Sequence, residues 1–327
     1  MRQLEWSDPR TLADAIGQLG PDHVVKAGGI ELMDLLKEGL IAPSRLVNLR
    51  AVPGLDRIQD RGAEGVRVGP LVTLARLAED RAVHARWRAL AESAADAATP
   101  QIRNMATVGG NLLQRPRCWY FRSEQFPCLR KGGDRCFAQD GENEYHAVFG
   151  HRVCCAVHPS SLATALLALG AAVELTGPRG SRVVPLEQFF VPAETVRERD
   201  TVRDDDEVLT DVLLPAPASG SASAYIKQAQ KESYDWPLIE VAVAIERGAG
   251  GACIRASVVL GAVAPTPWRA RAAEVALVGR PIDESSARDA GKAALQGAAA
   301  LRDNAYKLPL LEVAVRRALL ASVENAR

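Results

Sequence analysis

The chain has 327 residues, which is enough for two or three domains with substantial hydrophobic cores. It carries 40 basic and 40 acidic residues and no formal net charge, which argues against a general nucleic-acid-binding or basic membrane-binding surface. No apolar run in the sequence approaches the roughly 20 residues of a membrane span.

The N-terminal sequence "MRQLEWSDPRTLADAIGQLG" lacks the apolar run of a secretory signal peptide. A cytoplasmic location is therefore expected, and a periplasmic location is the alternative if a partner subunit carries an export signal. Thiols stay reduced in the cytoplasm. A cysteine cluster in this chain therefore predicts a metal site rather than a disulfide knot.

The first predicted unit alternates helices and strands. Apolar spacing and β-branched residues predict a helix, a strand, a helix and a strand over residues 11–20, 23–29, 31–40 and 44–49. This order places Gly28 and Gly29 in a turn between a strand and the following helix. Backbone N–H groups in such a turn can approach a phosphate, although paired glycines there are often only a turn. The pattern is neither G-x-G-x-x-G nor a P-loop, so a Rossmann dinucleotide site is not supported.

A second α/β unit follows, and a cysteine-rich segment interrupts it. Residues 65–80 predict a strand, a turn and a helix, and residues 86–98 predict a further helix. The sequence "TPQIRNMATVGGNLL", residues 99–113, offers a second glycine turn with Thr107 and Asn111 beside it. Residues 158–177 then resume with a helix and a strand, and Ser160 or Ser161 is suited to cap that helix.

The remaining third of the chain predicts strands followed by helices. Residues 215–223, "PAPASGSAS", have the composition of a linker. The glycine cluster of residues 247–252 lies between two strand-like runs and predicts a hairpin turn rather than a phosphate loop. Lys227 lies in a strand-like alternation, where a solvated lysine is the usual interpretation. Near a flavin, its positive charge would stabilise the anionic reduced ring.

Five of the six cysteines lie between Cys118 and Cys155. They lack the tight pairs of structural zinc sites and the C-x2-C-x2-C run of bacterial ferredoxins. Well-separated cysteines in a glycine-containing loop can still hold an iron–sulfur cluster. The cysteine spacing alone therefore leaves three interpretations: an iron–sulfur cluster, a zinc ion, or unliganded or redox-active thiols. The sixth cysteine, Cys253, is expected to be a small apolar core residue.

Six stretches, in order, resemble the FAD-binding subunit of the molybdenum hydroxylases, a family that includes xanthine dehydrogenase, aldehyde oxidoreductases, carbon monoxide dehydrogenase and 4-hydroxybenzoyl-CoA reductase. They are "VVKAGGIELMDLLK", "TPQIRNMATVGGNLL", "AVHPSSLATALLALGA", "YIKQAQKESYDWPLIEVAVAI", "VLGAVAPTPWRARAAE" and "DNAYKLPLLEVAVRRAL". The insertion after "TVGGN" resembles the extra 4Fe–4S loop of the periplasmic-type aldehyde oxidoreductases and of 4-hydroxybenzoyl-CoA reductase. "QRPRCWYF", "PCLR" and "EYHAVFG" are most similar to the aldehyde oxidoreductase branch.

The resemblance implies an α+β fold class. It implies a two-subdomain α/β FAD-binding fold of the vanillyl-alcohol-oxidase/PCMH type over residues 1–215, with subdomains 1–55 and 56–215 and a 4Fe–4S insertion at 115–156. A smaller α+β C-terminal domain would span residues 222–327. The implied function is electron transfer in a heterotrimer, or a dimer of heterotrimers, with a molybdenum-cofactor large subunit and a 2Fe–2S small subunit. FAD would pass the electrons to an external acceptor.

The resemblance also implies a set of cofactor-binding residues. FAD would contact Lys26, Ala27, Gly28, Gly29, Ile30, Glu31 and Leu32 at its pyrophosphate, and Thr107, Gly110, Asn111, Leu113, Ser160, Ser161 and Lys227 elsewhere. Two departures put side-chain contacts in question. The family usually has Thr and then Asp or Asn where Ile30 and Glu31 stand, and Asp where Ser161 stands.

The implied cluster ligands are Cys118, Cys128, Cys136 and Cys154. Cys154 is chosen because the matching family members carry a cysteine four residues before the histidine of "HPS". Cys155 is expected to point away, since neighbouring residues of an extended segment face opposite sides. A self-contained flavin oxidase, a subunit of a 4-hydroxybenzoyl-CoA reductase-like enzyme and a non-enzymatic zinc scaffold are the alternative functions.

Overall fold

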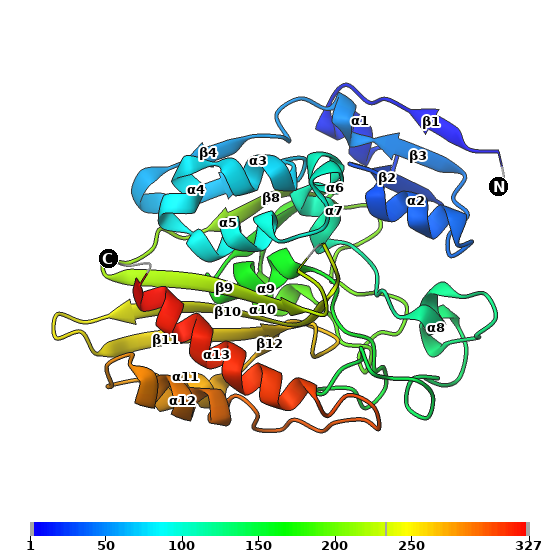
Figure 1. Ribbon diagram of the computed structural model, residues 1–327. Helices are drawn as coiled ribbons and strands as arrows, with labels where there is room; N and C mark the ends of the chain where they lie inside the picture. Colours follow the sequence, from blue (N-terminus) through cyan, green and yellow to red (C-terminus); the bar gives the residue numbers. More distant parts are fainter. Residues whose placement is uncertain (1–2, 233, 325–327) are drawn as a thin grey trace.

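The computed structural model describes residues 3–232 and 234–324, and the chain folds around three β-sheets (Figure 1). A parallel sheet of order β1-β3-β2 forms the N-terminal unit. Parallel strands require crossover connections, and helices α1 and α2 provide them. The elements are β1 (Glu5–Ser7), α1 (Leu12–Ile16), β2 (His23–Lys26), α2 (Ile30–Lys37), β3 (Arg45–Asn48) and the 3-10 turn η1 (Leu49–Ala51).

The second unit is an antiparallel sheet of order β4-β5-β8-β6-β7 with helices packed on it. Its strands are β4 (Ile58–Asp60), β5 (Val66–Val68), β6 (Ala172–Gly177), β7 (Gly180–Pro185) and β8 (Val208–Leu214). Its helical segments are η2 (Gly62–Glu64), α3 (Leu74–Glu79), α4 (Arg81–Arg86), α5 (Arg88–Ala95), α6 (Pro100–Met105), α7 (Val108–Leu112), α9 (Ser161–Ala168) and α10 (Leu186–Phe189).

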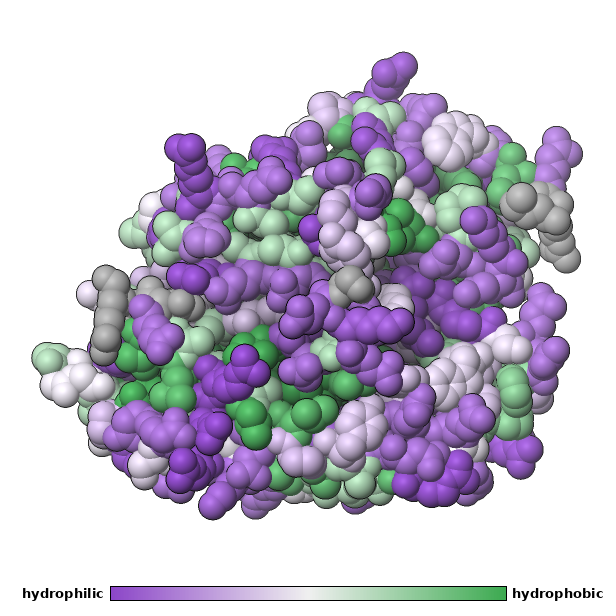
Figure 2. Space-filling view, viewed as in Figure 1, coloured by the Kyte–Doolittle hydropathy of each residue, from purple (hydrophilic) through white to green (hydrophobic). Residues whose placement is uncertain are grey.

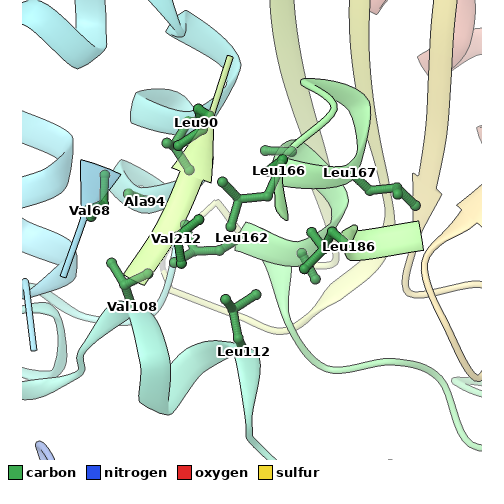
Figure 3. Close-up of a cluster of buried hydrophobic side chains, with 14 of the residues drawn as sticks. Val68, Leu90, Ala94, Val108, Leu112, Leu162, Leu166, Leu167, Leu186 and Val212 are labelled. Carbon is green, nitrogen blue, oxygen red and sulfur yellow. The ribbon is translucent and has the colours of Figure 1, made fainter. Parts of the chain in front are cut away.

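Helix α9 is the centre of the main hydrophobic core. All eight of its residues are buried, because the sequence "SLATALLA" offers no charged face to solvent. Figure 3 shows Leu162, Leu166 and Leu167 of α9 among apolar side chains that come from α5, α7, β5, β8 and α10. This packing fixes the N-terminal end of α9, which carries Ser160 and Ser161, relative to α7.

The third unit is an antiparallel sheet of order β12-β11-β10-β9 that helices cover. Helix α13 packs on β9 and β10, and α11 packs on β11 (Figure 1). In the same view, Figure 2 shows hydrophilic side chains over most of the face, with hydrophobic side chains gathered toward the C-terminal helices. The elements are β9 (Ser221–Ala229), β10 (Pro237–Arg247), β11 (Cys253–Gly261), β12 (Trp268–Arg269), α11 (Arg271–Leu277), α12 (Glu284–Ala293) and α13 (Lys307–Glu324).

The expected elements are largely confirmed, with one difference at the second glycine pair. The hairpin turn at residues 247–252 joins β10 to β11, and Cys253 is fully buried in the C-terminal core. Gly109 and Gly110, however, lie inside α7 rather than in a strand–helix turn. Thr107 caps this short helix by accepting the N–H of Gly110, which favours the helical conformation. Among the described residues, no helix is long and apolar enough to cross a membrane.

The cysteine insertion leaves the second unit after α7 and returns to it before α9. It contains little regular structure: α8 (Trp119–Arg122) and the 3-10 turn η3 (Leu129–Lys131). Figure 1 shows it at the side of the molecule, below α2 and beside the chain that leads into α13. Its last part, Val148 and Phe149, packs in the core of the C-terminal unit.

The segment before α13 holds the second half of the insertion by polar contacts. Asn304 is fully buried, and its Nδ2 atom donates to the carbonyl oxygens of His146 and Ala147, both at 3.1 Å. Lys307, also fully buried, donates to the carbonyl oxygens of Tyr145 at 3.1 Å and Ala262 at 2.9 Å. Carbonyl groups of the insertion that lie outside strands and helices thus accept hydrogen bonds from side chains of the C-terminal unit.

We expect Asn304→Ala to lower the free energy of unfolding by about 2 kcal/mol, because two buried carbonyl groups lose their donor. Arg302→Ala is the matched control. Its guanidinium also donates to the insertion, at the carbonyl of Gly141, but it lies in solvent and should change the stability by less than about 0.5 kcal/mol. Urea unfolding followed by tryptophan fluorescence measures both changes. Equal effects of the two substitutions would contradict the assignment of Asn304 as the anchor.

Candidate functional site

The two glycine-containing segments contact each other at the boundary between the first two units. A Cβ atom added to Gly28 would lie 1.9 Å from the carbonyl oxygen of Met105, so no side chain fits there. Gly29 precedes α2 with φ of +89°, a left-handed conformation that favours glycine. The structure therefore brings the turn at Gly28 and Gly29 against the segment that ends just before Thr107 and α7.

Several polar residues expected around the cofactor lie close together, because hydrogen bonds join the segment after Thr107 to the start of α9. Ser160 caps α9 and also donates to Oδ1 of Asn111 at 2.6 Å. Gln114, which sequence reasoning missed, donates to the carbonyl oxygens of Asn111 at 3.0 Å and Pro159 at 3.1 Å. Neighbouring elements thus carry three of the predicted residues, Thr107, Asn111 and Ser160, and hydrogen bonds fix their positions. Leu113 packs against the main core.

Three predicted side chains are engaged elsewhere. Leu32 is buried in a small core with Leu36 of the same helix and Leu46 of β3. The carboxylate of Glu31 accepts the backbone N–H of Arg115 at the start of the cysteine insertion, at 3.0 Å. Ser161 donates to the carboxyl group of Glu240 in β10. Only the backbones of Glu31 and Leu32 are left for a cofactor, because their side chains bind other parts of the protein.

Glu240 is the most deeply buried acidic residue near this region, with 1% of its surface exposed. Its Oε1 accepts the hydroxyl of Tyr225 at 2.7 Å and that of Ser161, and its Oε2 accepts the hydroxyl of Thr164 at 3.3 Å. Burial raises the pKa of Glu240. This network joins α9 of the second unit to the sheet of the third. A glutamate inside the apolar strand "LIEVAVAI" is the pattern that could have predicted it.

Lys227 lies in β9, directly opposite Glu240 in the register of the sheet. Its Nζ donates to the carbonyl oxygen of Asp96, the residue that ends α5, at 3.0 Å. Burial raises the pKa of the Asp96 carboxyl, which the nearby Lys227 charge partly offsets. The expectation of a strand lysine is confirmed, and its ammonium group faces the second unit rather than bulk solvent. Lys26 is the first of the residues 26–32 expected at the pyrophosphate, and it is the last residue of β2. Its ammonium group lies 5.6 Å from the centroid of the Trp6 ring.

The five clustered cysteines converge although they are spread along the insertion. Cys128, Cys136, Cys154 and Cys155 are all buried, Cys118 is partly buried, and all are free thiols. Hydrogen bonds from the thiols of Cys154 and Cys155 lower the pKa of Cys136. Both members of the pair therefore lie beside Cys136. The expectation that Cys155 points away is wrong, because this part of the chain is not a regular strand and its side chains do not alternate.

One sulfur of this group accepts a hydrogen bond from the backbone. The N–H of Arg130 donates to Sγ of Cys128 at 3.4 Å. Burial nevertheless raises the pKa of Cys128, because it penalises the charged thiolate more than this bond favours it. The S–H of Cys155 donates to the carbonyl oxygen of His151 at 3.7 Å.

The surroundings of the thiols are apolar and aromatic. Burial raises the pKa of Cys118 to about 12. Its Sγ lies 3.2 Å from Nε2 of His146, and burial lowers the pKa of that histidine to about 4. The rings of Tyr120, Phe126 and Phe137 pack against one another beside the thiols. Within residues 3–232 and 234–324, no three histidine, cysteine or acidic side chains are close enough to hold a single metal ion.

Comparisons with known proteins place the chain among flavoproteins. Residues 2–217 match the family described as the FAD binding domain in molybdopterin dehydrogenase, and residues 224–322 match the CO dehydrogenase flavoprotein C-terminal domain. The chain is 35% identical over 282 residues to the aldehyde oxidoreductase FAD-binding subunit PaoB of Escherichia coli (strain K12), covering 85% of this chain and 86% of that protein. It is 28% identical to the carbon monoxide dehydrogenase medium chain of Hydrogenophaga pseudoflava, covering 98% and 97%.

Solved structures of similar proteins confirm the expected fold class. Carbon monoxide dehydrogenase from Hydrogenophaga pseudoflava matches with a TM-score of 0.77 and 28% identity, over 99% of this chain and 98% of that chain. Quinoline 2-oxidoreductase from Pseudomonas putida 86 matches with a TM-score of 0.76 and 25% identity, over 99% of this chain and 98% of that one. Both matches extend over the FAD-binding part and the C-terminal part together.

We expect the stability difference between the wild type and Glu240→Gln to depend on pH. Because burial raises the pKa of Glu240, the folded protein binds this proton more tightly than the unfolded chain does. The free energy of unfolding therefore falls as the pH rises from the ordinary carboxyl pKa toward the raised one, and glutamine removes this fall. Urea unfolding at about pH 5 and about pH 8 measures it. If the variant and the wild type lost stability equally over this range, Glu240 would not be the titrating group.

Proposed function

This chain belongs to the family of FAD-binding subunits of the molybdopterin dehydrogenases, and from that membership we propose a specific function. The chain is an oxidoreductase subunit that binds FAD. We propose that it also binds a 4Fe–4S cluster and transfers electrons within an aldehyde oxidoreductase. Its partners would be a molybdenum-cofactor large subunit and a 2Fe–2S small subunit. Electrons would arrive from the 2Fe–2S clusters and leave for an external acceptor.

Sequence identity and the cysteine insertion support the aldehyde branch. The identity to the Escherichia coli aldehyde oxidoreductase subunit is 35%, against 28% for the carbon monoxide dehydrogenase medium chain of Hydrogenophaga pseudoflava. The segments that flank the cysteines resemble the aldehyde oxidoreductases as well. A subunit of a 4-hydroxybenzoyl-CoA reductase-like enzyme remains the alternative within the family.

The contacts between the two glycine-containing segments support a FAD site at their junction. The backbone of residues 26–32 would hold the pyrophosphate, because the N–H groups at the start of α2 favour an anion. Thr107, Gly110, Asn111 and Ser160 would line the second side, where their hydrogen bonds already fix their positions. FAD, when bound, supplies the exchange between two-electron and one-electron transfer. The ammonium group of Lys227 would supply positive charge near the ring.

The family resemblance and the gathering of these free thiols in one apolar cluster support Cys118, Cys128, Cys136 and Cys154 as the cluster ligands. Thiolates bind iron, and the N–H of Arg130 that donates to Cys128 offsets part of the cost of burying negative charge there. A cluster also spans more space than one ion, so its ligands need not be as close together as those of a zinc site. The aromatic rings around the thiols would shield the cluster from water. When bound, the cluster supplies single-electron transfer.

The absorption spectrum of the purified chain tests the function as a whole. We expect flavin bands on top of broad iron–sulfur absorbance, and no oxidation of aldehydes unless the molybdenum and 2Fe–2S subunits are added. Flavin bands alone, with aldehyde oxidation by the isolated chain, would favour a self-contained flavin oxidase. A colourless protein that contains zinc would favour the scaffold alternative.

The adjacent cysteines give a sharper test of the cluster. We expect Cys154→Ser to lose the broad absorbance and the bound iron, because one of four thiolates is missing. Cys155→Ser is the matched control, since the thiol of Cys155 donates to the carbonyl oxygen of His151. That variant should keep both. Iron content and absorbance near the flavin bands are the measurements, and the opposite pattern would make Cys155 the fourth ligand.

A further inference from the structure

Helix α2 presents a row of acidic side chains to the cysteine insertion. Glu31, Asp34 and Glu38 follow at spacings of three and four residues, which places them on one face of the helix. Arg117 and Arg122 of the insertion lie against this face. The same helix begins at the Gly29 turn, so the insertion is attached to the element whose N-terminus would hold the pyrophosphate.

The ion pairs on this face are short and partly shielded from water. Arg122 lies 2.8 Å from Oε1 of Glu31 and 2.9 Å from Glu38, with 10% of its side chain exposed. Arg117 lies 2.6 Å from Oε2 of Glu31 and 2.9 Å from Asp34. Glu31 is thus shared by both arginines, and 14% of its side chain is exposed. Low exposure limits the screening that makes surface ion pairs weak.

Arg117 also reaches the second cofactor-binding segment. One of its terminal nitrogens lies 3.3 Å from Oε1 of Gln114, the residue that holds the backbone of Asn111. The ring of Trp236, from the C-terminal unit, covers the guanidinium with 5.2 Å between charge and ring centroid. The guanidinium therefore has a fixed position between the two glycine-containing segments.

Charge at the start of α2 is the physical reason for this arrangement. The N-terminus of a helix attracts anions through its free N–H groups and its dipole. A carboxylate in the first turn competes for this attraction and repels a pyrophosphate bound nearby. An arginine paired with that carboxylate cancels the repulsion. Such a cancellation depends on the insertion being docked in place.

We propose that Arg117 and Arg122 are positioning residues that neutralise Glu31, so that FAD affinity depends on the docked cysteine insertion. The inference rests on the proposed placement of the pyrophosphate at the Gly29 turn. Because linkage is reciprocal, bound FAD stabilises the docked insertion by the same free energy. The two cofactor regions are thereby coupled through one shared glutamate.

A double-mutant cycle on the full chain tests the proposal, with the dissociation constant of FAD, measured by the change in flavin fluorescence, as the readout. We expect Arg117→Gln to weaken FAD binding by about tenfold, because the negative charge of Glu31 is then only half compensated. Glu31→Gln keeps the backbone that would hold the pyrophosphate and should tighten FAD binding, because the repelling carboxylate is gone while both arginines remain. The double variant Glu31→Gln with Arg117→Gln should return to within about threefold of the wild type.

Asp34→Asn is the matched control. It removes the other carboxylate partner of Arg117, but one turn further from the N-terminus of α2, and should leave the dissociation constant unchanged. Arg117→Lys keeps the charge and should retain most of the affinity. Circular dichroism and thermal unfolding confirm that each variant is folded.

Three outcomes would overturn the proposal: an unchanged affinity of Arg117→Gln, an equal loss in Asp34→Asn, or a double variant as weak as Arg117→Gln. The last result would mean that Arg117 itself binds the phosphates. A wild-type chain that binds no FAD would instead reject the proposed function, so the two failures are distinguishable.

Discussion

The cysteine insertion has almost no helix or strand of its own, and the arrangement of both cofactor regions depends on how it is held. Its first half is attached by arginine–carboxylate pairs to α2, and its second half by buried donors on the C-terminal unit. In the second half, Val148 and Phe149 also pack in the C-terminal core, so polar contacts and apolar packing act together there. Buried polar groups cost free energy unless every partner is in place, so these contacts also specify one position for the segment.

This anchoring holds the thiols of the insertion in one apolar cluster. Tyr120 and Phe137 pack beside them, while Asn304 and Lys307 fix the chain that carries His146. Under the proposed function, a segment that is already held in place would require less ordering when a cluster binds, because the conformational entropy has been lost on folding.

Elements with strong periodicity or turn chemistry could be predicted from the sequence: α2, α9, the hairpin at 247–252 and the buried Cys253. The helical placement of Gly109 and Gly110 could not, because the Thr107 cap and the apolar neighbours outweigh the tendency of glycine to form turns. The contacts of individual side chains were harder to predict than the helices and strands. Glu31 and Ser161 have partners far away in sequence, which only the tertiary fold brings near.

Glu31 shows how partners that are distant in sequence can be recognised once the fold is known. The family resemblance implies Asp or Asn at this position. The carboxylate of Glu31 reaches Arg117 and Arg122 while its backbone stays in the first turn of α2. A departure from the family pattern at the edge of a cofactor site therefore need not weaken that site. Here it is matched by two arginines in the same chain, and under the proposed FAD site these arginines connect the insertion to the pyrophosphate end of α2.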